Sequence, residues 1–324
     1  MKRLTKKECE ESKKIIEGIK TEVNRALIGQ QEVLDGVIKG ILCEGHVLVE
    51  GVPGIAKTLM IRALGEAMGG KMGRIQFTAD LLPTDIIGLT TYTPNKGFHL
   101  NKGPVFTNFL LADEINRSPP KTQSALLQSM QEKEVTIGKK TFSLHSPFFV
   151  MATQNPLENA GVYPLPEAQV DRFIFKLIMK YPSKESDVEI MGRNMSIHKF
   201  EDFNIKRVTS PEKIKKIQDR VKRVYISHEL KKYISEITHM SRGGDFEFSE
   251  HIEWGASPRG SIAMFIGAKA NALMQGRDYV VTQDVKDVVY PVLRHRILLG
   301  YAARAQKVNS DKVIKSMLDK IPAP

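Results

Sequence analysis

The sequence predicts an α/β domain with a mainly parallel sheet and inserted β-hairpins, followed by an all-α domain. Strand-like and helix-like segments alternate through the first half of the chain, as they do where helices connect parallel strands. Two short β-prone runs around glycine interrupt this alternation. The second half is almost wholly helical in pattern. The change falls near Tyr181, so we place the two domains at residues 1–183 and 184–324.

Length and composition are those of an ordinary globular protein with two domains. The chain has 324 residues, 41% of them hydrophobic and 26% charged, which is more chain than one core usually organises. Its 2 cysteines, Cys9 and Cys43, lack metal-ligand spacing, which argues against a disulfide framework or a zinc site. No signal-peptide pattern and no apolar stretch of roughly 20 residues is present. We therefore expect a cytoplasmic protein without membrane contact.

The first elements frame a candidate phosphate-binding loop. The segment VNRALIGQQEVLDGVIKGILC, which begins at Val23, has apolar residues at helical spacing and precedes the apolar strand GHVLVEG. That strand stops at Gly51, and the helical pattern KTLMIRALGEAM then runs from Lys57 to a glycine at its end. GVPGIAKT therefore lies between a strand and a helix, where backbone N–H groups and the helix N-terminus can bind phosphate.

The loop itself follows the pattern G-x-x-x-x-G-K-T, with Ala56 in place of the second glycine. Lys57 is placed to reach the β- and γ-phosphates of a nucleotide, and the Thr58 hydroxyl can hold Mg²⁺. The residues expected to contact the nucleotide are Gly51, Val52, Pro53, Gly54, Ile55, Ala56, Lys57 and Thr58.

Polar side chains end the next two apolar strands. The strand segment FTNFLLADE ends with Asp113 and Glu114. Asp113 can bind Mg²⁺ directly or through water, and Glu114 can polarise a water molecule. The alternative for this pair is a helix N-cap followed by an acid in the first turn. SPFFVMATQNP ends at Asn155, whose amide can orient the attacking water and sense the γ-phosphate. As an alternative, Asn155 is a turn residue that introduces Pro156.

The remaining elements complete the predicted fold. Residues 90–104 and 134–146 are predicted to form the two inserted hairpins. Helices are expected at residues 211–224, 228–241, 258–275 and 282–299, with Pro, Ser or Thr at their starts. The 8 histidines show no metal-ligand spacing, so His145 and His295 are expected to be structural. No Ser/His/Asp or Cys/His arrangement of a nucleophile is evident.

Taken together, these motifs resemble the MoxR family of AAA+ ATPases over roughly residues 23–297. They are GVPGIAKT, GPVFTNFLLADEINRSPPKTQSALLQSMQEKEVTI, ATQNP, YPLPEAQVDRF and GASPRGSIAM. In this branch of AAA+ proteins alanine is accepted before the loop lysine. The resemblance implies that Lys57 and Thr58 are the Walker A pair, Asp113 and Glu114 the Walker B pair, and Asn155 sensor 1.

The same resemblance assigns two arginines. Arg259 resembles the sensor 2 arginine, which reaches from the helical lid to the γ-phosphate; its alternative is an arginine at a helix start that faces water. Arg172 resembles the arginine finger donated to the ATP of a neighbouring subunit. Its alternative is an intrachain salt bridge with Asp171 or Glu167, and Arg117 is the competing finger candidate.

The resemblance implies Mg²⁺-dependent ATP hydrolysis by a ring, expected to be a hexamer, that remodels or matures a VWA-domain protein or metalloprotein. The hairpins near Phe98 and Gly138 would correspond to the helix 2 insert and the pre-sensor 1 hairpin. One alternative is a nucleic-acid translocase, which the net charge of +11 and Lys139-Lys140 favour but for which no appended DNA-binding domain is evident. Another is a nucleotide-gated scaffold with little turnover, against which the presence of Glu114 argues.

Overall fold

The computed structural model describes residues 3–94, 97–156, 161–193 and 199–324, and these residues form two compact units. The α/β unit comprises Ile15–Pro166 and Leu177–Lys216. The helical unit comprises Met1–Lys14, Glu167–Lys176 and Ile217–Pro324. The short segment Glu167–Lys176 thus groups with the helical unit, although residues of the α/β unit flank it in sequence. The predicted boundary after residue 183 stays a prediction.

The α/β unit contains a sheet in the strand order β2-β5-β8-β1-β9. The pairs β2–β5, β5–β8 and β8–β1 are all parallel, so the predicted fold class is confirmed. The register places Gln76 opposite Asp113, and Glu50 opposite Gln154. The carboxyl ends of these strands therefore meet at one edge of the sheet, where ligands bind in open α/β sheets. The strands are β1 (Val47–Gly51), β2 (Met72–Gln76), β5 (Phe109–Asp113), β8 (Phe149–Gln154) and β9 (Phe175–Met179).

Buried apolar side chains fix this sheet and the helices on it. Strands β5 and β8 are buried over almost their whole length, as expected for strands covered on both faces. The predicted helical segment from Val23 is interrupted: one helix ends at Val23, the next begins at Gln31, and Gly29 in the turn between them has a left-handed φ of 73°. The helices of this unit are α2 (Gln31–Leu42), α3 (Lys57–Met68), α4 (Pro83–Ile87), α5 (Pro120–Glu132) and α7 (Lys184–Arg193), with 3₁₀ turns η1 (Ile115–Arg117) and η2 (Phe200–Phe203).

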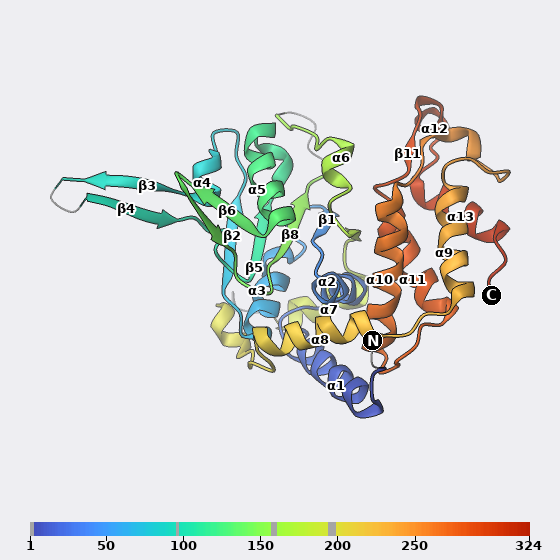
Figure 1. Ribbon diagram of the computed structural model, residues 1–324, viewed down its shortest axis with the longest axis horizontal. Helices are drawn as coiled ribbons and strands as arrows, with labels where there is room; N and C mark the ends of the chain where they lie inside the picture. The colour runs from blue at the N-terminus through green and yellow to red at the C-terminus, as the bar shows by residue number, and fades with distance from the viewer. Residues whose placement is uncertain (1–2, 95–96, 157–160, 194–198) are drawn as a thin grey trace. The chain divides into compact units, whose positions relative to one another are not determined.

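Both predicted hairpins are confirmed. Strands β3 (Gly88–Thr93) and β4 (Gly97–Lys102) pair antiparallel, as do β6 (Glu134–Ile137) and β7 (Lys140–Ser143). Residues 95–96, which fall within the first predicted hairpin, lie outside the described residues. Figure 1 shows β3–β4 extending away from the rest of the α/β unit.

The helical unit differs from the predicted all-α domain in one respect. The helix predicted over residues 282–299 ends at Leu293, and Leu298–Leu299 form β11, which pairs with β10 (Ile252–Trp254). The helix ends early because the side chains of His295 and Arg296 turn to bind carbonyl groups of residues 171–174. The helices of this unit are α6 (Glu167–Val170), α9 (His228–Met240), α10 (Pro258–Met274), α11 (Thr282–Leu293), α12 (Tyr301–Ala305) and α13 (Ser310–Lys320), with the 3₁₀ turn η3 (Ser249–His251).

Two further helices, α1 (Lys6–Val23) and α8 (Pro211–Arg223), contribute residues to both units. Within the described residues, no helix has the length and apolar character needed to cross a membrane.

Candidate functional site

The loop between β1 and α3 has the backbone of a phosphate-binding loop. Gly51 must be glycine, because a Cβ there would approach the Met179 carbonyl oxygen to 2.8 Å. Gly54 has a left-handed φ of 81°, and the space beside it is open. Ala56 is also left-handed, with φ 67° and ψ 23°. An alanine in this conformation costs about 1–2 kcal/mol, which accounts for the glycine that the general pattern has at this position.

The two side chains after the loop lie on the first turn of α3. Lys57 is only 9% exposed, and its Nζ donates a hydrogen bond to the Gly51 carbonyl oxygen at 2.6 Å. The Lys57 ammonium group therefore lies against the first residue of the loop that precedes it in sequence. Thr58 is half-buried beside it. The N-terminus of α3, which runs for 12 residues, adds its partial positive charge to that of Lys57.

Thr153 fixes the two acids at the end of β5. Its hydroxyl donates to Asp113 Oδ1 at 2.7 Å and accepts from the Glu114 backbone N–H at 2.9 Å. Arg74 Nη2 donates to Asp113 Oδ2 at 2.8 Å. The Asp113 carboxylate is thus bound to neighbouring strands, and Glu114 makes no side-chain cap for η1. This geometry disfavours the alternative in which the pair only caps a helix.

The Glu114 carboxylate is also held in place. Its Oε2 accepts from Gln76 Nε2 at 2.8 Å and lies 3.2 Å from Arg117 Nε. Arg74 donates to Gln76 Oε1 at 2.7 Å, so one hydrogen-bonded network joins β2 to both acids. Arg74, Gln76 and Thr153 were not predicted from the sequence. The alternation of Arg74 and Gln76 around the buried Ile75 was the available signal.

Asn155 follows β8 directly and is 6% exposed. Since β8 lies between β5 and β1 in the sheet, Asn155 leaves the sheet between the acids and the loop. The structure thus brings Lys57, Asp113, Glu114 and Asn155 to the same edge of one sheet. Their roles in catalysis stay predictions.

A pocket of about 420 Å³ adjoins the loop within the α/β unit. Most of its lining is apolar, and Gln30 is fixed there by donating to the Lys180 carbonyl oxygen at 2.9 Å. Such a lining suits the flat face of a nucleobase. The pocket could not be predicted from local sequence patterns, because its residues come from three separate segments: Ala26, Ile28, Gln30, Pro53, Gly54, Ile55, Ala56, Leu59, Tyr181, Pro182, Asp187 and Ile190.

The donor set of the site fits Mg²⁺. Thr58 offers a hydroxyl oxygen and Asp113 a carboxylate oxygen, the ligand types that this cation prefers. Among the described residues, no group of three or more His, Cys, Asp or Glu could hold a metal ion.

Arg172 and Arg259 lie in the helical unit. Arg172 is half-buried, and no ion pair of the described residues joins it to Asp171 or Glu167. Asp171 instead contacts Arg296 at 2.7 Å and Arg259 at 3.8 Å. Arg117, the competing finger candidate, contacts Glu114 of its own chain.

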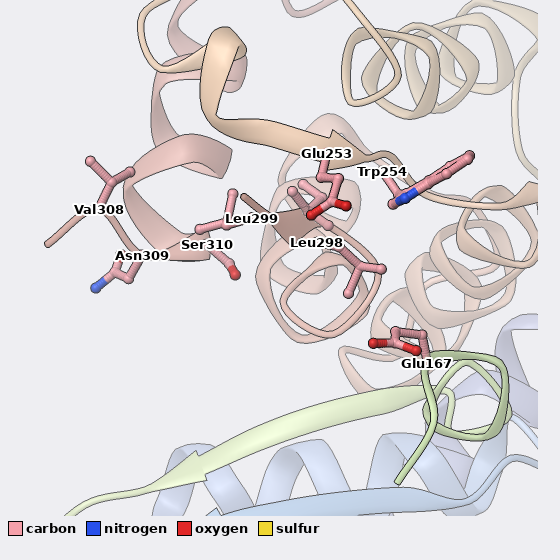
Figure 2. Close-up of a pocket in the computed structure, with 9 residues that line it drawn as sticks. Glu167, Glu253, Trp254, Leu298, Leu299, Val308, Asn309 and Ser310 are labelled. Carbon is pink, nitrogen blue, oxygen red and sulfur yellow. The ribbon is translucent and has the colours of Figure 1, made fainter. Parts of the chain in front are cut away.

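The helical unit has a pocket of its own, of about 640 Å³ (Figure 2). Leu298 and Leu299 of β11 form apolar lining, and the carboxylates of Glu167 and Glu253 add negative charge. Trp254 lies at the pocket, is 67% exposed, and is the only tryptophan of the chain.

Two family models match separate parts of the chain. A sequence model of the ATPase family associated with various cellular activities (AAA) matches residues 46–175, and a model of the AAA lid domain matches residues 247–317. Chaperone MoxR1 of Mycobacterium tuberculosis is 44% identical over 308 residues, which are 94% of this chain and 81% of that protein. The uncharacterized protein YeaC of Bacillus subtilis is 40% identical over 93% of this chain and 92% of its own. A crystal structure of a protein from Cytophaga hutchinsonii matches with a TM-score of 0.89 and 43% identity, covering 98% of this chain and 97% of that one.

Proposed function

Because this chain belongs to the MoxR family of AAA+ ATPases, we propose that it hydrolyses Mg²⁺-ATP as a ring of identical subunits in the cytoplasm. The observation that carries the proposal is the hydrogen-bonded edge of the sheet, where Thr153 and Gln76 hold Asp113 and Glu114 beside the phosphate loop. Carboxylates that are fixed before substrate binds need little reorganisation during the reaction.

We propose that the loop and the pocket beside it together bind ATP. The adenine would occupy the apolar pocket of about 420 Å³, and the phosphates would lie against the N–H groups of residues 51–58 and the N-terminus of α3. Lys57 would exchange its hydrogen bond with Gly51 for the β- and γ-phosphates. Thr58 and Asp113 would hold Mg²⁺, which neutralises charge on the transferring phosphoryl group.

Hydrolysis would proceed by direct attack of water on the γ-phosphate, without a covalent intermediate. Glu114 accepts the proton of the water, and Asn155 orients that water against the phosphate. Arg259, the candidate sensor 2 arginine, would contact the γ-phosphate bound by its own subunit. Arg172 from a neighbouring subunit would complete the charge stabilisation, so that a single subunit is a poor enzyme.

Thr153→Val should lower turnover by roughly 10- to 100-fold and raise the Mg²⁺ concentration needed for half-maximal rate, as is typical when a group that orients metal ligands is removed. Valine has the shape of threonine but leaves the Glu114 N–H unpaired and removes the donor to Asp113. Thr153→Ser keeps the hydroxyl and is the matched control. Equal Mg²⁺ dependence of the two variants would refute this role of Thr153.

If each site is completed by a neighbouring subunit of a ring, the ATPase rate per subunit should rise with protein concentration. We would measure this rate over a wide concentration range, with sedimentation of the same samples and Lys57→Ala as the blank. A rate that rises as oligomers form supports a site shared between subunits. A constant rate in a dilute monomer would show that the site is complete in one chain, and the ring mechanism would be wrong.

The biological role that we propose is the remodelling or maturation of a VWA-domain protein or metalloprotein by a hexameric ring. Its support is the resemblance to the family and the name Chaperone MoxR1 of a relative with 44% identity. Purification of the Glu114→Gln variant with ATP, which should retain clients, tests it directly. Recovery of nucleic acid instead of a protein client would favour the translocase alternative.

A further inference from the structure

Arg296, just beyond the carboxyl end of α11, is bound on all sides within the helical unit. It is 6% exposed. Its Nε donates to Asp171 Oδ1 at 2.7 Å, and its Nη2 donates to the carbonyl oxygens of Asp171 at 3.1 Å and Phe173 at 2.8 Å. Its Nη1 donates to the carbonyl oxygens of Ile174 at 3.2 Å and Val292 at 2.6 Å. A single guanidinium therefore ties α11 to the short segment around Arg172.

His295 adds a second attachment to the same segment. It is 7% exposed, and its Nε2 donates to the Phe173 carbonyl oxygen at 2.9 Å. Residues on both sides of Arg172 are thus fixed through their carbonyl groups. The Arg172 side chain, in contrast, makes no hydrogen bond or ion pair with any described residue. The contacts of this segment therefore fix the backbone around Arg172, while its guanidinium group can still bind a partner outside the segment.

Asp171 also connects this segment to the start of α10. Its Oδ2 accepts a hydrogen bond from the Ser257 hydroxyl at 3.0 Å. The same hydroxyl accepts from the Arg259 backbone N–H at 3.2 Å and so caps α10. The direct contact between Arg259 Nη1 and Asp171 is 3.8 Å and half-exposed, so it contributes little by itself. The buried contacts of Arg296 and the Ser257 cap are what hold the two arginines together.

We propose that Arg296 and Asp171 are positioning residues for the arginine finger, and that they keep Arg172 in a fixed relation to Arg259. The inference rests on the proposed function, in which Arg172 contacts the ATP of a neighbouring subunit and Arg259 the ATP of its own. A movement of α10 that follows from ATP binding then carries Arg172 with it. The nucleotide state of one site is thereby passed to the next site through Asp171.

Arg296→Lys is the test, because lysine keeps the charge but cannot replace a planar fork with five donors. Turnover should fall by about 10²-fold, the loss expected from a displacement of about 1 Å at a reacting site. ATP affinity, measured by calorimetry, should stay close to that of the parent, because the loop and its pocket are unchanged. The matched control is Arg294→Lys, two residues away, where Arg294 binds Asp311 with distances of 2.6 and 2.9 Å instead of the finger segment. The control should keep most of its activity.

Mixed rings separate a positioning role from a purely structural one. Glu114→Gln subunits cannot hydrolyse ATP but offer an intact finger, so they should restore turnover at the sites of Arg296→Lys subunits. No restoration in rings verified to be mixed, or an equal loss in Arg294→Lys, would overturn the inference. If Arg296→Lys is fully active while Arg172→Ala, measured separately, is inactive, the inference is wrong but the finger role of Arg172 still stands. Full activity of Arg172→Ala itself would instead remove the finger from the proposed function, and this inference with it.

Discussion

Replacing Arg172 by alanine is expected to lower ATP turnover by about 10³-fold or more, the magnitude that a supplied arginine finger contributes in related phosphoryl transfers. The guanidinium would face the γ-phosphate of the neighbouring subunit, where charge develops during the reaction. ATP affinity should change little, because the binding loop and its pocket belong to the other chain. Steady-state turnover and calorimetric binding on the same preparation measure the two quantities separately.

Mixed rings provide the control for this variant. Glu114→Gln subunits carry an intact Arg172, so combining them with Arg172→Ala subunits should bring turnover back. If verified mixed rings stay inactive, the finger role passes to Arg117 or Arg172 acts within its own subunit. The Arg117–Glu114 contact of 3.2 Å makes Arg117 the less available of the two candidates.

Replacing Glu114 by glutamine is expected to abolish hydrolysis while ATP binding remains. The amide cannot accept the proton of the attacking water, and general bases typically contribute about 10²- to 10⁴-fold in rate. The shape of the side chain and its contact with Gln76 can be kept. Single-turnover hydrolysis of prebound ATP is the direct measurement.

Glu66→Gln is the matched control for that variant, since Glu66 is an exposed glutamate on α3. It should hydrolyse ATP at the rate of the parent. Turnover by Glu114→Gln equal to that of this control would exclude Glu114 as the activating carboxylate.

Local patterns were sufficient to predict the strand-loop-helix at the phosphate loop, the two hairpins and most helices. Each of these depends on neighbouring residues: apolar periodicity, a glycine turn, or a polar residue at a strand end. The helix predicted over residues 282–299 was too long, because contacts of His295 and Arg296 with residues far away in sequence outweigh helical propensity. Periodicity cannot anticipate such contacts.

The network around the acids depends on strand order in the same way. Arg74, Gln76 and Thr153 bind Asp113 and Glu114 only because β2 and β8 flank β5, and alternation along one strand does not reveal which strand lies beside it. The grouping of residues 167–176 with the helical unit is equally non-local.

The position of Trp254 makes the helical unit directly observable by spectroscopy. Because Trp254 is the only tryptophan of the chain, it is the sole source of the fluorescence that is excited at wavelengths where only tryptophan absorbs. Because it is 67% exposed beside the pocket of Figure 2, that emission is sensitive to water around its indole ring. Anything that covers this surface, whether a neighbouring subunit or a client, should shift the spectrum of the unlabelled protein. The natural sequence thus contains a single-site fluorescent probe for assembly.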